Sequence, residues 1–232
     1  MVNKEKFIVV DIKKETDDTV TIFLSSAGEK LSYRAGQYVA LYFDEKESSQ
    51  GKFYTISSSP AEKYVALSVK KIGQFSSLIH DLKVNDTIFL SGPFGYFYPE
   101  TEENSLVFLA AGIGVTPFLS IVKDYADRDI KREIDLYYTN KTLKDIAFFQ
   151  EVNKLAKKCI LRIHYYLTRD TTKHELISGY ERIKAVDIKR DLGALNKRDY
   201  YICGPISFVT DMRKQLLALK VKEKNIFTES FF

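Results

Sequence analysis

The sequence comprises 232 residues, of which 45% are apolar, and its 35 basic and 31 acidic side chains leave a net charge of +4. This mild, interleaved charge does not favour a nucleic-acid partner, and without a signal peptide or an apolar run of about 18 residues we expect a cytoplasmic protein with no membrane insertion. Two cysteines, Cys159 and Cys203, and three scattered histidines predict no metal site, so any redox chemistry would come from an organic cofactor.

Alternating apolar and polar residues in the first hundred positions predict short β-strands. The strands are expected near Phe7–Ile12, Val20–Leu24, Val39–Phe43, Tyr64–Val69 and Thr87–Leu90. One short helix is expected over Phe75–Leu82, where apolar residues share a face. Short strands separated by Gly and Ser are typical of a β-barrel or a β-sandwich.

The hydrophobic period changes near residue 105. Ser105–Ala111 is a continuous apolar run, as in a buried parallel strand. Further elements then alternate, with helices from Thr116, over Leu143–Lys157 and over Phe208–Leu219, and strands over Glu133–Thr139, Leu161–Leu167, Tyr200–Cys203 and Asn225–Glu229. This alternation predicts a parallel sheet flanked by helices. We expect two domains, residues 1–100 and 101–232, divided in the polar segment 98–105.

The strand that ends at Ala111 leads into a glycine-rich turn and a helix start. The turn contains Gly112, Gly114, Thr116 and Pro117 in the pattern G-x-G-x-T-P. Glycine lets a ligand approach the backbone, the N–H groups of a helix start attract phosphate, and proline suits the first helical turn. Tight packing between a strand and a helix also uses glycine, so this motif alone leaves both interpretations open.

Two segments of the first domain offer groups for a flat cofactor with a phosphate tail. Lys52-Phe53-Tyr54-Thr55 places a cation, an aromatic ring and a hydroxyl on a short strand. Gly73-Gln74-Phe75-Ser76-Ser77 opens the short helix with backbone N–H groups and hydroxyls. A plain strand and a serine-capped helix are the alternative interpretations.

Two segments near the end of the chain are similarly ambiguous. Cys203-Gly204-Pro205 ends a predicted parallel strand, at the edge where α/β sheets bind ligands. A buried, inert cysteine is the alternative. Glu229 and Phe231 belong to a terminal segment that either faces a ligand or simply docks on the core.

Taken in order, these segments resemble the ferredoxin–NADP reductase superfamily over almost the whole chain. Lys52-x-Tyr54-Thr55 is similar to the family's Arg-x-Tyr-Ser/Thr flavin motif, and residues 73–77 resemble the segment that holds the flavin pyrophosphate. Residues 112–117 and 203–205 resemble its two nicotinamide-nucleotide motifs, and residues 229–231 resemble its terminal acid-x-aromatic signature.

The resemblance implies a six-stranded antiparallel Greek-key β-barrel that carries FAD, followed by a Rossmann-like five-stranded parallel sheet, flanked by helices, that binds NAD(P)H. It implies that Tyr54 packs on the isoalloxazine ring and that Thr55 lies near its N5 atom. It also implies that Lys52, Ser76 and Ser77 hold phosphates.

The same resemblance assigns the second domain and the chain end to the nicotinamide. Thr116 and Cys203 would lie beside the nicotinamide ring, Glu229 near the reacting atoms, and Phe231 over the flavin ring. Thr55, Cys203 and Glu229 are therefore the expected catalytic residues. The flavin would supply the redox chemistry, and the protein would hold the two rings close together.

Two features leave the cofactors partly open. Lysine at position 52 lacks the two-pronged phosphate contact of arginine, so FMN stays an alternative to FAD. Asn140 and Lys141 are expected to bind the nicotinamide nucleotide. Residues 140–145 resemble the Asn-x-Thr-x-x-Asp pattern of NADH-using relatives and slightly favour NADH, although Lys141 could contact the 2′-phosphate of NADPH.

The expected function is an NAD(P)H oxidoreductase that passes electrons from FAD to a separate acceptor, such as a ferredoxin, a flavodoxin, an oxygenase component or a small molecule. An electron-transfer subunit of a larger complex is one alternative, and a flavin-binding sensor without turnover is another. The known electron-transfer subunit of this type carries a C-terminal cysteine cluster. This sequence lacks such a cluster, which counts against the first alternative. Cys203 and Glu229 count against the second.

Overall fold

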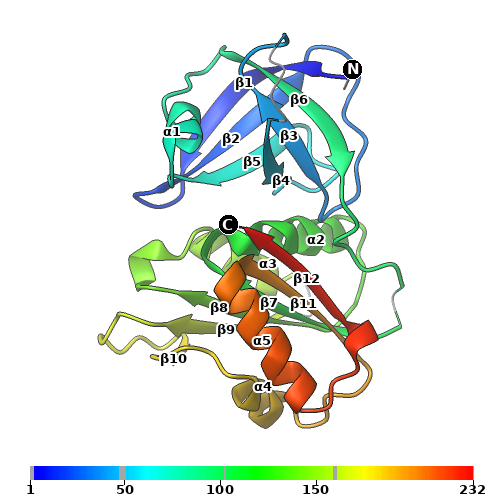
Figure 1. Cartoon of the computed structure of the whole chain (residues 1–232), viewed down its shortest axis with the longest axis vertical. Coiled ribbons are helices and arrows are strands. Elements are labelled where there is room, and N and C mark those ends of the chain that lie inside the picture. The colour runs from blue at the N-terminus through cyan, green and yellow to red at the C-terminus, as the bar shows by residue number, and fades with distance from the viewer. Residues whose placement is uncertain (1–2, 47–50, 102, 159–160, 232) are drawn as a thin grey trace.

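The computed structural model describes residues 3–46, 51–101, 103–158 and 161–231, so Cys159 lies outside the described residues. An antiparallel sheet occupies the N-terminal half and a parallel sheet the C-terminal half, and the two follow one another along the long axis of the molecule (Figure 1). The expected combination of a β domain with an α/β domain is confirmed.

The N-terminal sheet has six antiparallel strands in the order β4-β3-β6-β1-β2-β5. They are β1 (Glu5–Lys14), β2 (Thr19–Ser26), β3 (Tyr38–Tyr42), β4 (Lys52–Thr55), β5 (Val65–Lys70) and β6 (Thr87–Phe94), with helix α1 (Gln74–His80) between the last two. Ile56, directly after β4, pairs with Leu67 of β5, so the sheet curls until its two edges touch. β6 lies between β3 and β1, which is the expected Greek-key crossover.

Because side chains alternate along each strand, one face of the N-terminal sheet forms a hydrophobic core and the other faces the second domain. Ile22 and Leu24 of β2 and Leu67 and Val69 of β5 are fully buried inside the curled sheet. Because successive side chains of a strand point to opposite faces, Ser68 points the other way. Ser68 is nevertheless buried, since this face of β5 contacts the turn after β7 (Ser105–Ala111) in the second domain.

The C-terminal sheet has six strands, all parallel, in the order β10-β9-β8-β7-β11-β12. After β7 they are β8 (Ile134–Asn140), β9 (Leu161–Leu167), β10 (Ile177–Gly179), β11 (Arg198–Pro205) and β12 (Ile226–Phe231). The expectation of five strands missed β10, because three residues are too few to show a hydrophobic period.

Helices cover both faces of the parallel sheet. A 3-10 turn (Gly112–Val115) leads into α2 (Thr116–Asp127), which covers one face with α3 (Phe149–Ala156); α4 (Ala185–Leu192) and α5 (Ile206–Ala218) cover the other. The helix expected over 143–157 is instead a 3-10 turn (Leu143–Asp145) followed by α3, because Phe148 adopts φ +60° and interrupts it. Within the described ranges no helix is long and apolar enough to cross a membrane.

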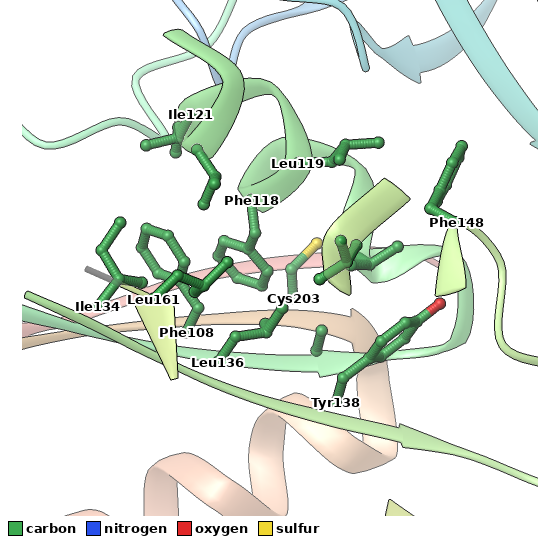
Figure 2. Close-up of a cluster of buried hydrophobic side chains, with 14 of the residues drawn as sticks. Phe108, Phe118, Leu119, Ile121, Ile134, Leu136, Tyr138, Phe148, Leu161 and Cys203 are labelled. Carbon is green, nitrogen blue, oxygen red and sulfur yellow. The ribbon is translucent and has the colours of Figure 1, made fainter. Parts of the chain in front are cut away.

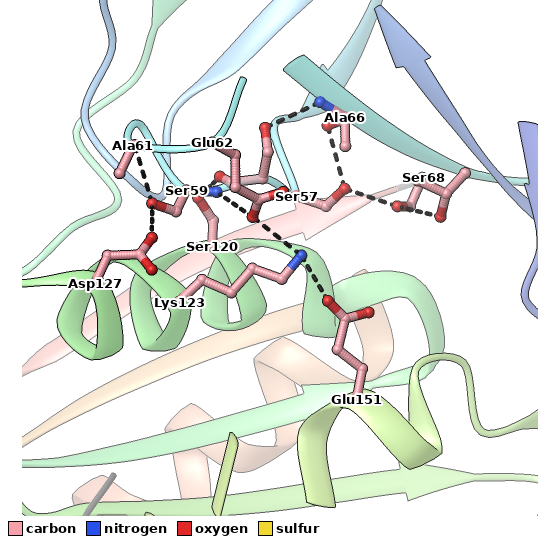
Figure 3. Close-up of polar contacts among 12 residues, drawn as sticks. Ser57, Ser59, Ala61, Glu62, Ala66, Ser68, Ser120, Lys123, Asp127 and Glu151 are labelled. Carbon is pink, nitrogen blue, oxygen red and sulfur yellow. Dashed lines mark hydrogen bonds and ion pairs between the residues drawn. The ribbon is translucent and has the colours of Figure 1, made fainter. Parts of the chain in front are cut away.

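The two domains meet along α2 and the loop after β4 (Figure 3). Ser59 Oγ donates to Asp127 Oδ2 at 2.5 Å, and Ser120 Oγ donates to the carbonyl oxygen of Ser58 at 2.6 Å. Lys123 adds an ion pair of 3.3 Å to a glutamate of the same loop. These contacts attach the barrel to the helix that begins at the glycine-rich turn.

Candidate functional site

A cavity of about 1000 Å³ lies between the two sheets and takes side chains from both domains. On the barrel side, the sequence-predicted residues that line it are Lys52, Phe53, Tyr54, Thr55, Gly73, Gln74, Phe75 and Ser76. On the α/β side they are Gly112, Thr116, Asn140, Lys141, Gly204, Pro205 and Phe231. The predicted residues outside the lining are Ser77, Gly114, Pro117, Cys203 and Glu229. Segments far apart in the sequence thus meet around one space.

Tyr54 and Phe75 form the aromatic part of the barrel wall. Their ring centroids lie 6.5 Å apart with the rings 22° from parallel, and Phe43 packs against Phe75 at 4.9 Å. Burial raises the pKa of Tyr54 to about 12, so its hydroxyl stays protonated at neutral pH. The two rings offer an apolar surface to a flat aromatic ligand.

The turn before α1 uses its serine hydroxyls internally. Ser76 Oγ accepts hydrogen bonds from the N–H groups of Ile72 and Gly73, both at 2.9 Å, and donates to the carbonyl oxygen of Gly73. Ser77 Oγ donates to the same carbonyl at 3.0 Å. The hydroxyls therefore shape the turn.

The glycine-rich turn after β7 combines an open position with a crowded one. Gly112 has φ +54°, and no heavy atom lies within 4 Å of the place where its Cβ would stand. A Cβ on Gly114, in contrast, would lie 2.3 Å from the carbonyl oxygen of Cys203. Gly112 therefore opens backbone to the cavity, whereas Gly114 lets the turn pack against β11.

The Cys203 side chain points into the protein core (Figure 2). It is fully buried in the cluster between the parallel sheet and α2, which includes Phe118. Burial, with a smaller effect of nearby Glu229, raises the pKa of this thiol. Of the predicted Cys203-Gly204-Pro205 motif, the structure places only the last two residues at the cavity wall.

Glu229 connects the chain end to the barrel. It pairs in register with Cys203 across β12 and β11, and its Oε1 accepts a hydrogen bond from Thr55 Oγ1 at 3.4 Å. Burial raises the pKa of Glu229 to about 7, and the Thr55 hydrogen bond partly opposes that rise. Since Thr55 lines the cavity, a hydroxyl–carboxyl pair joins the two domains at its wall.

Sequence reasoning missed three cationic residues of the lining, Lys70, Arg169 and Arg182, and Lys70 forms an ion pair of 2.9 Å with Asp18. Arg169 lies just after β9, and the rule that ligands gather at the carboxyl ends of parallel strands would have found it. Arg182 follows β10, the short strand that left no hydrophobic pattern.

The cavity wall suits nucleotide cofactors. The Cβ position of Gly73 is as open as that of Gly112, and exposed backbone of this kind lets a phosphate reach N–H groups. Nδ2 of Asn140 is buried, and the Asn140 side chain interacts with the hydroxyl of Tyr138.

Two family models match the chain. Residues 6–98 match the oxidoreductase FAD-binding domain, and residues 108–214 match the oxidoreductase NAD-binding domain. The flavohemoprotein of Bacillus subtilis is 28% identical over 97% of this chain, and flavohemoprotein A of Dictyostelium discoideum is 25% identical over 97%. The chain spans about three fifths of the length of these relatives, 58% and 60% respectively.

Solved structures agree with the family models. The FAD/NAD-binding domain of nitric oxide dioxygenase from Vibrio cholerae superposes with a TM-score of 0.84 at 26% identity, covering 98% of both chains. The ferredoxin–NADP+ reductase of Neisseria gonorrhoeae, with bound FAD and NADP, superposes over both complete chains with a TM-score of 0.85 at 22% identity, a likeness of fold. The chain belongs to the oxidoreductases that join an FAD-binding domain to an NAD-binding domain, the arrangement of the ferredoxin reductase-like superfamily.

Proposed function

We propose that this reductase takes a hydride from NAD(P)H onto FAD within the inter-domain cavity and passes the electrons to a separate acceptor. The observation that carries the proposal is that one cavity of about 1000 Å³ is lined by flavin-motif residues of the barrel and nucleotide-motif residues of the α/β domain. Holding two reactants side by side supplies much of the rate of such a transfer.

On the barrel side, residues 1–100, we assign Tyr54 to the face of the flavin ring and Thr55 to its reacting edge. Lys52 and the backbone N–H groups of Gln74 and Phe75, at the start of α1, hold the phosphates. Ser76 and Ser77 act by shaping that backbone, since their hydroxyls are already bonded within the turn.

On the α/β side, residues 101–232, we assign Gly112 and Thr116 to the nucleotide because both line the cavity at the start of α2. Asn140 lines the cavity at the carboxyl end of β8. Phe231 lines the cavity and packs partly on the α/β core, so its ring is placed to cover a bound cofactor. Cys203 contributes through its backbone, since its thiol is in the core.

Bound FAD would supply the redox chemistry, since a flavin can exchange electrons in pairs or singly. The protein supplies a carboxyl group that can hold a proton near the cavity wall, that of Glu229. Glu229 changes its charge near neutral pH because burial raises its pKa to about 7, and Thr55 orients its carboxylate. This pair is placed to hold or move a proton at Oε1 of Glu229 as electrons enter and leave the cavity.

We propose a one-electron acceptor outside this chain, such as a ferredoxin, a flavodoxin, an oxygenase component or a haem group. The haem is favoured by the flavohemoprotein relatives, whose additional length this chain does not span. The same fact supports a second candidate, in which the reductase works as one electron-transfer unit of a larger assembly.

The test is NAD(P)H-driven reduction of ferricyanide, a one-electron acceptor, by the FAD-loaded protein and two tyrosine variants. Tyr54→Ala removes a ring of the cavity wall, whereas Tyr96→Ala removes a ring that is 83% exposed and outside the lining. We expect Tyr96→Ala to behave as wild type and Tyr54→Ala to bind FAD roughly tenfold more weakly. Unchanged FAD affinity and rate in Tyr54→Ala would contradict the proposed flavin site, and a bound flavin reduced by neither nucleotide would favour a sensor.

A further inference from the structure

A row of buried polar side chains leads from the cavity wall along the N-terminal sheet. Ser68 of β5 lines the cavity, and its Oγ lies 2.9 Å from Oγ1 of Thr21, its register partner on β2. Thr21 Oγ1 donates to Oε1 of Glu15 at 3.0 Å. Both hydroxyl residues are buried, and the Glu15 side chain is 5% exposed. Two hydrogen bonds therefore connect the cavity wall to a carboxylate outside the lining.

The row has one hydrogen fewer than it has hydrogen bonds. On its other side, Ser68 Oγ lies 2.8 Å from Oγ of Ser57, which also donates to the carbonyl oxygen of Ala66 at 3.1 Å (Figure 3). The four hydrogen bonds from this carbonyl to the carboxylate of Glu15 share three hydroxyl hydrogens, because a carbonyl and an ionised carboxylate supply none. One added proton completes the set, and a small shift of each hydroxyl hydrogen moves that proton along. The row can therefore take up and pass on a single proton.

The outer end of the row reaches the surface of the molecule. Oε2 of Glu15 pairs with Nζ of Lys13 at 3.0 Å, and the Lys13 side chain is 51% exposed. Glu151 of α3 lies 3.9 Å from the same ammonium group. Glu15 also acts electrostatically on the hydroxyl of Tyr138, which donates to the carbonyl oxygen of Ala147. A proton on Glu15 thus lies beside a solvated cation, one step from water.

The proposed reaction leaves one proton in the cavity at each turnover. A C–H bond of NAD(P)H breaks, and the hydride brings two electrons and one proton to the flavin. Two one-electron acceptors then remove the electrons alone, so the proton has to reach the solvent. FAD and a nucleotide bound together in a cavity of about 1000 Å³ exclude water from it, so the proton needs a path through the protein.

We propose that Ser68, Thr21 and Glu15 form a proton relay that carries this proton from the cavity to the solvent. The inference rests on the proposed function and adds the route by which its proton leaves. Ser68 accepts the proton while its own hydrogen moves to Thr21, the hydrogen of Thr21 moves to Glu15, and Glu15 releases it to water beside Lys13. Glu229, which lies in the other domain and is bonded to Thr55, is the competing exit.

The experiment follows proton release and flavin oxidation separately in a stopped-flow instrument. FAD-loaded protein is reduced with stoichiometric dithionite, so that no nicotinamide nucleotide is needed, and is mixed with excess ferricyanide in weak buffer that contains a pH-indicator dye. For the wild type we expect the dye to respond together with the return of the flavin band. Infrared difference spectra of the same oxidation should show a transient protonated carboxyl band that Glu15→Gln removes.

Thr21→Val removes the middle hydroxyl of the relay and keeps the shape of the side chain. We expect it to slow proton release roughly a hundredfold, the low end for a positioned proton-transfer group, and we expect Thr21→Ser to restore the rate. Thr19→Val is the matched control, because Thr19 is an equally buried threonine of β2 that lies outside the lining and bonds to Asp18. Ser68→Ala breaks the relay at its inner end and should behave as Thr21→Val does.

Wild-type proton release in Thr21→Val and Ser68→Ala would overturn the relay. Equal slowing in Thr21→Val and Thr19→Val would overturn it as well, because the effect would then come from packing. Slow release in Glu229→Gln alone would assign the exit to the chain end instead. A wild-type flavin that dithionite reduces but neither nucleotide reduces would contradict the proposed function, while the relay would still be judged by the release of its proton.

Discussion

The turn after β7 packs against β11 through Gly114 and opens backbone to the cavity at Gly112. Replacing each glycine by alanine separates these two roles. A Cβ on Gly114 would lie 2.3 Å from the carbonyl oxygen of Cys203 and 2.7 Å from the N–H nitrogen of Gly204, both backbone atoms that cannot move independently. We expect Gly114→Ala to cost about 3 kcal/mol or more, at the upper end for overpacking. For a chain of this size, that cost lowers the Tm by roughly 6 to 12 °C.

Gly112→Ala is the matched control in the same turn. Its Cβ meets no atom within 4 Å, so the stability cost is only that of a left-handed backbone, about 1 kcal/mol or roughly 2 to 4 °C. Because this Cβ enters the cavity, nucleotide affinity should fall about tenfold. Thermal melts and nucleotide titration of both variants measure the two effects. Equal Tm losses, or a Gly112→Ala protein with wild-type nucleotide affinity, would refute this division of roles.

Three further changes test other parts of the structure. Asp135→Asn removes a fully buried carboxylate that binds Arg162 at 2.7 and 2.8 Å. Because the Arg162 side chain is 49% exposed, water can solvate the cation that remains, and the change should cost about 1 to 3 kcal/mol in urea unfolding; an unchanged unfolding curve would contradict the role of this ion pair. Ser120→Ala leaves the carbonyl oxygen of Ser58 without its inter-domain donor and should cost about 1 to 2 kcal/mol, and an unchanged melting curve would argue against this contact. Glu229 has a pKa of about 7, above its unfolded value near 4.3, so its ionisation destabilises the fold increasingly as pH rises from about 4.5 to 7. The Tm of Glu229→Gln relative to wild type should rise across that window and level off above it, and a constant difference would rule out burial of this carboxyl.

Much of the fold could be predicted because its strands carry strong patterns. β7 was predicted at its observed bounds because a continuous apolar run identifies a buried strand, and the predicted bounds of β9 match the observed ones as well. β10 and α4 were missed because the segment around them is polar and β10 has only three residues. The formation of β10 and α4 depends on contacts with the neighbouring sheet, and a local sequence pattern does not reveal such contacts.

At the candidate site, the directions in which the side chains point were harder to predict than the strands that carry them. The motif identified the segment around Cys203, but the alternation of β11 sends its thiol to the α2 face together with Tyr201, and only the folded sheet decides which face that is. Arg169 and Arg182 belong to no local motif. They reach the cavity through the register of β9 and β10, a property of the pairing of two strands.

The most direct test of the central claim, that FAD and a nicotinamide nucleotide meet in the inter-domain cavity, is an anaerobic titration of the purified FAD-loaded protein followed by visible absorption. The account predicts that NADPH or NADH bleaches the flavin band rapidly and stoichiometrically, and that Gly112→Ala slows the bleaching. A tightly bound flavin that stays oxidised with both NADPH and NADH would contradict it.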